Sequence, residues 1–377
     1  MMDFSFSEEQ QLIKESVEKF IEKDYSFEAR NKLLKTPERF SRALWKQYAE
    51  LGWLGIALPE EFGGYGGSAI ETMLVMEAFG SAMVLEPYLS TVVMGANAVL
   101  FGGSDAQKKT LLPKVASGEL MLSVAYAEPT SRYELADVQT KATATAGGYS
   151  LSGEKIVVLN GGTADKLIVS ARTSGARLDQ NGISLFLVDR NAAGVELSVY
   201  DTADGSQAAN VRLNGATGEL LGGEGQGHAL LDQVIDTATA ALCAQALGAM
   251  NSAFRRTLDY TKTREQFGVP IASFQVLQHR LVDMFMSSEA SRSMVYMVSM
   301  EVMKSDATAR RKAVSAAKAY VGQHARAVAQ DAVQIHGGVG MTEELDVGHY
   351  FRCLTLFCSS FGSTDHHLQR YARLSQQ

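Results

Sequence analysis

The chain has 377 residues, which is too long for one simple core, so we expect two or three domains. Its 42 acidic and 35 basic side chains give a net charge of −7, which argues against a general nucleic-acid binder with a basic stripe. The cysteines, Cys243, Cys353 and Cys358, form neither a disulfide framework nor a CxxC metal pair, and they suit a reducing cytoplasm. The N-terminus lacks a secretory signal, and the longest apolar stretch is too short and too Gly-broken to span a bilayer.

The spacing of apolar residues divides the chain into three parts. Helical spacing dominates at first, and Ser7 with Gln10 forms a capping-box pattern at the first helix. From about residue 120 the apolar residues alternate or bunch in short runs, with a hairpin signal at Gly147-Gly148. From His228 on, one very long Ala-rich helix should lie buried against other helices. We predict an N-terminal helical domain at 1–118, a middle antiparallel β domain at 119–226 and a C-terminal helical bundle at 227–377.

Two further patterns invite a functional interpretation that their context does not support. The GGEGQG segment at Gly222–Gly227 precedes a helix, but its glycines lack the G-x-G-x-x-G spacing, so we interpret it as a strand-to-helix connector. His366 and His367 are adjacent and have no accompanying cluster of carboxylates or cysteines. We therefore expect a surface or interface pair there, and no metal site.

Two segments of the C-terminal part carry the strongest functional signal. Residues 260–278 read YTKTREQFGVPIASFQVLQ, and Gln334–Gly340 reads QIHGGVG. Either segment alone fits a helix end with a Gly-Gly cap and a solvated Arg. Together they resemble the C-terminal helical domain of the acyl-CoA dehydrogenase flavoprotein family. The resemblance implies that the ADP half of FAD is held by Arg264, Gln266, Phe267, Gln334, Gly337 and Gly338.

The chemistry of a pyrophosphate explains why these residue types serve that role. Arg264 can present a planar, permanently charged fork to two phosphate oxygens. Gly337 and Gly338 allow the backbone N–H groups to approach closely, because no Cβ stands in the way. The resemblance extends over nearly the whole chain, so it also implies the family fold and its reaction. That reaction is the α,β-dehydrogenation of an acyl-CoA thioester, with an electron-transfer flavoprotein as the expected electron acceptor.

The resemblance fails at the positions that serve the reacting atoms. In most members a Glu near the C-terminus removes the α-proton, and Phe361 stands there in this chain. A minority carry the base on the long helix, where this chain has Ala238 followed by Thr239. Asp365 is the nearest carboxylate to the first position; it is either a substitute base or, as we favour, a capping or solvated residue of the last helix. The family's polar contacts to the flavin ring are replaced by Ala127, Val157 and Leu159.

This uneven loss leads to three hypotheses. The first is a subunit of a heteromeric enzyme, in which this chain supplies the ADP-binding half of a site and a paralogous acyl-CoA dehydrogenase subunit supplies the catalytic Glu, as in a heterotetramer. Four segments, SRYELADV, ALCAQALGAM, VGHYFRCLT and FGSTDHHLQR, most resemble the small subunits of the pimeloyl-CoA dehydrogenase type within this family. The second is a self-sufficient homo-oligomer with Asp365 as base. The third is a scaffold subunit without FAD, which would not need both retained motifs.

Overall fold

The computed structural model describes residues 6–376, and these form two compact units that interleave along the chain. The first unit takes the chain up to Lys32, then Ala69–Val84, and then everything from Thr239 onward. The second unit consists of Leu33–Ser68 and Leu85–Ala238. The predicted boundaries at 118 and 226 stay predictions, because these units divide the chain at other places.

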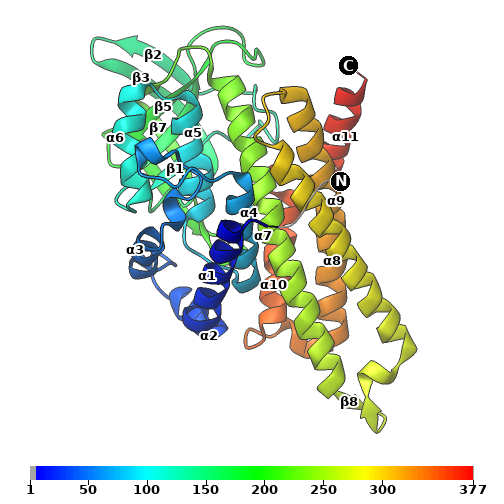
Figure 1. The fold of residues 1–377 in the computed structure, drawn as a ribbon. Helices are drawn as coiled ribbons and strands as arrows, with labels where there is room; N and C mark the ends of the chain where they lie inside the picture. The colour runs from blue at the N-terminus through cyan, green and yellow to red at the C-terminus, as the bar shows by residue number, and fades with distance from the viewer. Residues whose placement is uncertain (1–5, 377) are drawn as a thin grey trace. The chain divides into compact units, whose positions relative to one another are not determined.

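The first unit is helical apart from one small hairpin. Its first helix begins at the predicted capping box: the Ser7 hydroxyl accepts from the Gln10 N–H, and the Gln10 side chain accepts from the Ser7 N–H. Helices α8 and α9 run side by side in Figure 1, and the β8–β9 hairpin lies at the tip where α7 is followed by α8. The elements are α1 (Glu8–Asp24), α2 (Phe27–Leu33), α4 (Ala69–Ala82), α7 (Gly227–Thr263), β8 (Glu265–Gln266), β9 (Val269–Pro270), η4 (Ile271–Ser273), α8 (Gln275–Glu301), α9 (Ala307–His336), η5 (Gly337–Met341), α10 (Asp346–Ser359) and α11 (Thr364–Ser375).

The predicted long helix is confirmed as α7, whose 37 residues start in the second unit and end in the first. Its glycine content has a packing reason. A Cβ on Gly80 of α4 would lie 1.8 Å from the carbonyl oxygen of Gln245, and a Cβ on Gly248 would lie 1.9 Å from that of Glu77. The backbones of α4 and α7 therefore touch at two glycines, which explains why this stretch uses small residues.

The second unit contains a seven-stranded sheet and short helices. The GGEGQG segment connects β7 to α7, as expected, and Gly148 starts β3 after a two-residue turn from β2. The helices are α3 (Arg42–Glu50), η1 (Trp53–Gly55), η2 (Glu60–Phe62), the π-helix η3 (Leu89–Ala96), α5 (Asn97–Gly102) and α6 (Asp105–Ala116). The strands are β1 (Leu122–Ala125), β2 (Lys141–Thr145), β3 (Gly148–Leu159), β4 (Lys166–Arg172), β5 (Ile183–Asp189), β6 (Val195–Asp201) and β7 (Gln207–Leu221).

The β domain is confirmed, but two of its strand pairings are parallel. Strands β2–β3, β3–β7, β7–β5, β5–β4 and β6–β7 pair antiparallel, but β1 pairs with β4 in parallel over Leu122–Ala125. A single parallel pairing of Lys141 with Arg172 also joins β2 to β4 and closes β2, β3, β7, β5 and β4 into a ring. Two parallel neighbours need a long crossover connection between them. The chain between β1 and β4, which contains the β2–β3 hairpin, supplies this connection. Inside the ring lies an apolar core that includes Leu151, Leu167, Val169, Phe186 and Val211.

Candidate functional site

Arg264 lies at the base of the hairpin that follows α7. Its backbone N–H donates to the Tyr260 carbonyl at 2.8 Å, and its own carbonyl accepts from the Ile271 N–H at 2.8 Å. Both polar groups of its backbone are therefore fixed, while the exposed side chain has no hydrogen bond or ion pair to any residue in the described part of the chain. An anchored backbone with an uncommitted guanidinium suits a residue that receives an anionic ligand.

The turn of this hairpin holds Phe267 and Gly268, both with positive φ, at 56° and 78°. Positive φ at both central residues is the type I′ pattern that matches the twist of a hairpin, but it is unfavourable for a bulky residue such as Phe. The Phe267 side chain is 93% exposed, and its ring meets that of Phe274 edge-on at 6.0 Å. Gln266, also exposed, pairs with Val269 across the hairpin. The hairpin therefore holds an aromatic ring in solvent at a backbone conformation that is unfavourable for phenylalanine.

The second segment forms the C-terminus of α9 and the short helix after it. Gly337 caps α9 with φ 65°, which is a conformation that favours glycine. An ideal Cβ on Gly337 or on Gly338 would have no atom within 4 Å, and both residues are exposed. The space above this turn is therefore open. Gln334, one turn earlier on the helix, is exposed as well.

The structure brings the two segments together through Tyr260. The Tyr260 ring stacks on the His336 ring with centroids 4.3 Å apart and planes inclined by 23°. The hairpin of Arg264 and the turn of Gly337 are therefore joined at their bases, although about seventy residues separate them. This arrangement fits the ADP half of FAD, because a free planar cation and an open glycine turn lie on one end of the same helical bundle.

The positions expected at the flavin ring lie together on the second unit. The Ile156 N–H donates to the Ala127 carbonyl at 2.8 Å, which links the residue after β1 to the middle of β3. Val157, next along, has φ 53°, lies at a β-bulge and is 49% exposed. Ala127, Val157 and the half-buried Leu159 carry no side-chain hydrogen-bonding group, so at these positions the chain offers backbone groups and apolar contacts.

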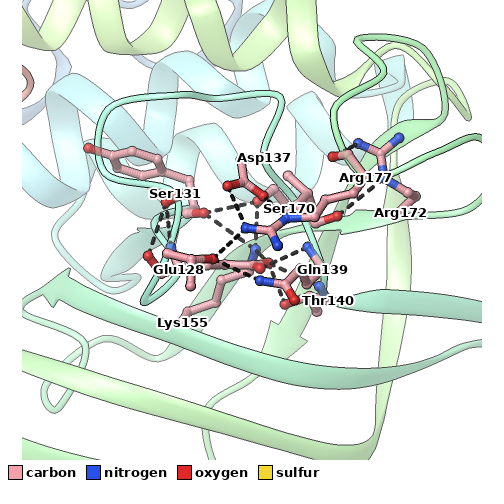
Figure 2. Close-up of polar contacts among 12 residues, drawn as sticks. Glu128, Ser131, Asp137, Gln139, Thr140, Lys155, Ser170, Arg172 and Arg177 are labelled. Atoms are coloured by element: carbon pink, nitrogen blue, oxygen red, sulfur yellow. Dashed lines mark hydrogen bonds and ion pairs between the residues drawn. The ribbon is translucent and has the colours of Figure 1, made fainter. Parts of the chain in front are cut away.

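A buried polar network that sequence analysis missed joins Glu128 to Lys155, two residues that adjoin these positions in sequence (Figure 2). Lys155 Nζ donates to Glu128 Oε1 at 2.7 Å and to the Ser170 hydroxyl at 3.0 Å. The exposed fractions of the two charged side chains are 0% for Lys155 and 2% for Glu128. The Thr140 hydroxyl and the backbone N–H groups of Gln139 and Thr140 also donate to the Glu128 carboxylate.

Burial and the contacts of this network shift the pKa values of both charged groups. Burial lowers the pKa of Lys155 to about 8, although the neighbouring carboxylate opposes that shift. Burial also opposes ionisation of Glu128, but the Lys155 ammonium and the hydrogen bonds from Thr140 together leave its pKa below the ordinary value. Glu128 follows Ala127, and Lys155 precedes Val157 by two residues. The ion pair therefore links the segment after β1 to β3, and these two segments carry the expected flavin-ring positions.

Two arginines, Arg172 and Arg177, hold the loop between Glu128 and Thr140. The Arg172 guanidinium donates to the carbonyls of Ala136 and Val138, at 3.0 and 3.2 Å. Arg177 forms a bidentate ion pair with Asp137, and it also donates to the Thr130 hydroxyl at 2.7 Å. The loop is therefore tied to the sheet by side-chain contacts (Figure 2).

Neither of the two expected base positions carries an acid in the structure. Phe361 is half-buried in the turn between α10 and α11, with φ 55°, and Ala238 is fully buried within α7. Asp365 lies exposed in the first turn of α11, next to the N-cap Ser363. A carboxylate at that place stabilises the helix through its dipole. A catalytic role for Asp365 stays a prediction.

The expectation of a surface or interface histidine pair is wrong for His367, which is 1% exposed within the single chain. Its Nε2–H donates to the Phe361 carbonyl at 3.1 Å, and Lys318 Nζ donates to the carbonyls of Phe357 and Gly362, both at 2.9 Å. Burial, and then the nearby cations, lower the pKa of His367 to about 3. The buried ring thus supplies a hydrogen-bond donor to the turn between α10 and α11. Within residues 6–376 no group of three or more His, Cys, Asp or Glu side chains is arranged to hold a metal ion.

Comparison with known proteins finds related domains along most of the chain. Three family models match successive parts of the chain: the acyl-CoA dehydrogenase N-terminal domain over residues 7–119, the middle domain over 123–215 and the C-terminal domain over 225–375. These define a flavoprotein oxidoreductase with FAD as its cofactor. The chain belongs to the acyl-CoA dehydrogenase family.

Individual relatives match over most of their length. The Bacillus subtilis protein named Probable acyl-CoA dehydrogenase YngJ is 32% identical over 93% of both chains. The mitochondrial isovaleryl-CoA dehydrogenase of Pongo abelii is 30% identical over 95% of this chain and 86% of its own length. Among solved structures, the ChsE4-ChsE5 complex from Mycobacterium tuberculosis has a chain with a TM-score of 0.90 at 28% identity, covering 100% of this chain and 99% of that one.

No helix in the described part of the chain reaches the length and hydropathy that a bilayer crossing requires.

Proposed function

We propose that this chain is one subunit of a heteromeric FAD-dependent acyl-CoA dehydrogenase, in which a paralogous partner supplies the catalytic Glu. The observation that carries the proposal is the contrast between the positions assigned to ADP binding and the positions where the family carries its catalytic base. The residues to which we assign ADP binding are exposed: Arg264 has an uncommitted side chain, and a Cβ added at Gly337 or Gly338 would meet no atom within 4 Å in the described part of the chain. The base positions hold Phe361 and Ala238, which cannot accept a proton.

Each group has a distinct task in this proposal. When bound, FAD supplies the hydride acceptor for α,β-dehydrogenation of the acyl-CoA. Arg264 binds the diphosphate as a bidentate donor, and the backbone around Gly337 and Gly338 approaches it closely. Phe267 and Gln266 on the hairpin would contact the same ADP half. The exposed hairpin faces the neighbouring subunit, so this chain holds the ADP half of an FAD whose flavin ring lies on the partner.

Solved relatives support a heteromeric arrangement as a precedent. The ChsE4-ChsE5 structure is described as a complex, and a steroid enzyme with two components, Tcur3481-Tcur3483, contains a chain with a TM-score of 0.89 and 29% identity to this one. Resemblance of four segments to small subunits of the pimeloyl-CoA dehydrogenase type makes a dicarboxylyl-CoA or a steroid side-chain thioester the substrate class that we propose. An electron-transfer flavoprotein as acceptor and a cytoplasmic location are part of the same proposal.

The decisive experiment measures the FAD content of the protein purified alone and of the protein co-expressed with a neighbouring acyl-CoA dehydrogenase paralogue. We expect a nearly colourless isolated protein, and a yellow complex with about one FAD for each pair of chains, because each site needs one donor of each kind. An isolated protein that retains one FAD per chain would contradict the heteromeric proposal. It would favour a self-sufficient homo-oligomer, for which Asp365 is the candidate base.

A further inference from the structure

Tyr260 is the residue at which the two halves of the ADP-binding segment meet. It lies on the last turn of α7, four residues before Arg264, and its carbonyl accepts the Arg264 N–H at 2.8 Å. Its ring stacks on His336, the last residue of α9 before the Gly337 turn. The Tyr260 hydroxyl also makes a long hydrogen bond of 3.5 Å to the His336 carbonyl. One side chain therefore contacts both segments.

His336 is itself held firmly on the other side. It is 5% exposed, and its Nδ1–H donates to the Ala332 carbonyl at 2.8 Å, which fixes the tautomer and the ring plane. Burial lowers the pKa of His336. A Cβ on Gly340 would lie 2.9 Å from the His336 Cβ, so the short helix η5 closes directly over this histidine. The His336 ring is therefore fixed in place, and it cannot easily move with the Tyr260 ring if that ring shifts.

We infer that Tyr260 and His336 are positioning residues for the ADP half of FAD, holding the Arg264 hairpin in register with the Gly337-Gly338 turn. The inference rests on the proposed function for the identity of the ligand, but the mechanical coupling is a property of this chain alone. Neither ring needs to touch the cofactor. Their task is to set the distance between a guanidinium on one segment and backbone N–H groups on the other, on which bidentate binding depends.

The chain provides a matched control on the same helix. Tyr320 and His324 of α9 form a second Tyr–His contact, with ring centroids 4.2 Å apart, but they lie more than three helical turns before Gly337. Replacing Tyr320 by Leu removes a comparable contact without touching either segment. Tyr260→Leu keeps an apolar, helix-favouring side chain while losing the flat ring, and Tyr260→Phe keeps the ring and loses the hydroxyl.

The first measurement is hydrogen–deuterium exchange of the purified chain without cofactor. In Tyr260→Leu we expect faster exchange in peptides covering both 264–271 and 334–341, whereas Tyr320→Leu leaves both at wild-type rates. Tyr260→Phe should resemble the wild type, because stacking persists. Faster exchange in only one of the two segments, or in neither, would overturn the coupling. This readout is independent of whether the protein is an enzyme.

The second measurement is FAD retention by the complex with its paralogous partner, followed by absorbance during dialysis. Tyr260→Leu should weaken retention between about twofold and tenfold, the range typical for loss of one aromatic pair, while Tyr260→Phe and Tyr320→Leu keep wild-type retention. Unchanged retention in Tyr260→Leu would overturn the positioning role. A wild-type complex that binds no FAD would instead refute the proposed function, and exchange would still decide whether the two segments are coupled.

Discussion

Glu128 and Lys155 form an ion pair of 2.7 Å between two side chains that are almost completely removed from solvent. Removing one partner of such a pair leaves an uncompensated buried charge, which typically costs about 3–5 kcal/mol. We therefore expect Lys155→Met to lower the free energy of unfolding by that amount, measured by urea denaturation.

A surface pair in the same domain serves as control. Lys166 and Asp189 lie 3.6 Å apart with side chains that are 35% and 56% exposed, so Lys166→Met should cost less than about 1 kcal/mol. The double variant Lys155→Met with Glu128→Gln should recover part of the loss, because the unpaired charge is gone. Equal costs for Lys155→Met and Lys166→Met would show that the buried network does not stabilise the domain.

His367 makes stability depend on pH in a defined direction. Its pKa is about 3 in the folded chain, well below the ordinary value, so between these two values the unfolded chain binds a proton that the folded chain excludes. The free energy of unfolding should therefore fall as pH drops below about 6.5, by about 1.4 kcal/mol per pH unit from this group. His367→Gln, which retains a donor for the Phe361 carbonyl but does not titrate, should flatten melting temperature against pH between 6.5 and 4. An unchanged slope would refute this assignment.

The proposed role of Arg264 depends on the planar shape of its guanidinium group as well as on its charge, and a substitution can separate the two. Arg264→Lys keeps a cation but loses the planar fork, so FAD retention by the complex should weaken about tenfold. Melting temperature without FAD should not change, because the side chain is exposed. Arg255→Lys, at an exposed position on α7 two turns before the hairpin of Arg264, is the control and should retain FAD normally. Identical retention in the two variants would exclude a role for Arg264 at the diphosphate.

Much of this arrangement could be predicted from the sequence because its signals are local. The capping box at Ser7, the long helix α7 and the hairpin near Gly148 each follow from neighbouring residues, and the ADP-binding segments carry compact motifs. The Glu128–Lys155 pair could not be predicted, since its members are 27 residues apart and a Lys in a strand normally indicates a solvated face. The burial of His367 and the stacking of Tyr260 on His336 likewise depend on contacts between distant residues, and the spacing of residues along the sequence does not predict them.

Asp365 separates the two enzymatic hypotheses. It lies exposed at the start of α11, where its charge serves the helix dipole, and loss of that charge costs about 0.3–1 kcal/mol at most exposed sites. Asp365→Asn should therefore lower melting temperature slightly and leave turnover of the complex within about twofold of wild type. A loss of about 10²-fold or more would assign Asp365 as a general base.

The most direct test of the central claim is acyl-CoA turnover by this chain alone, with FAD added, and by the same chain combined with a paralogue that has an intact Glu. Dicarboxylyl-CoA and steroid side-chain thioesters are the substrates to supply, with an artificial electron acceptor. We predict turnover by the isolated chain about 10²–10⁴-fold below that of the complex, since it lacks a positioned base. Turnover of the isolated chain at the rate of the complex, abolished by Asp365→Asn, would contradict the heteromeric account and establish a self-sufficient enzyme.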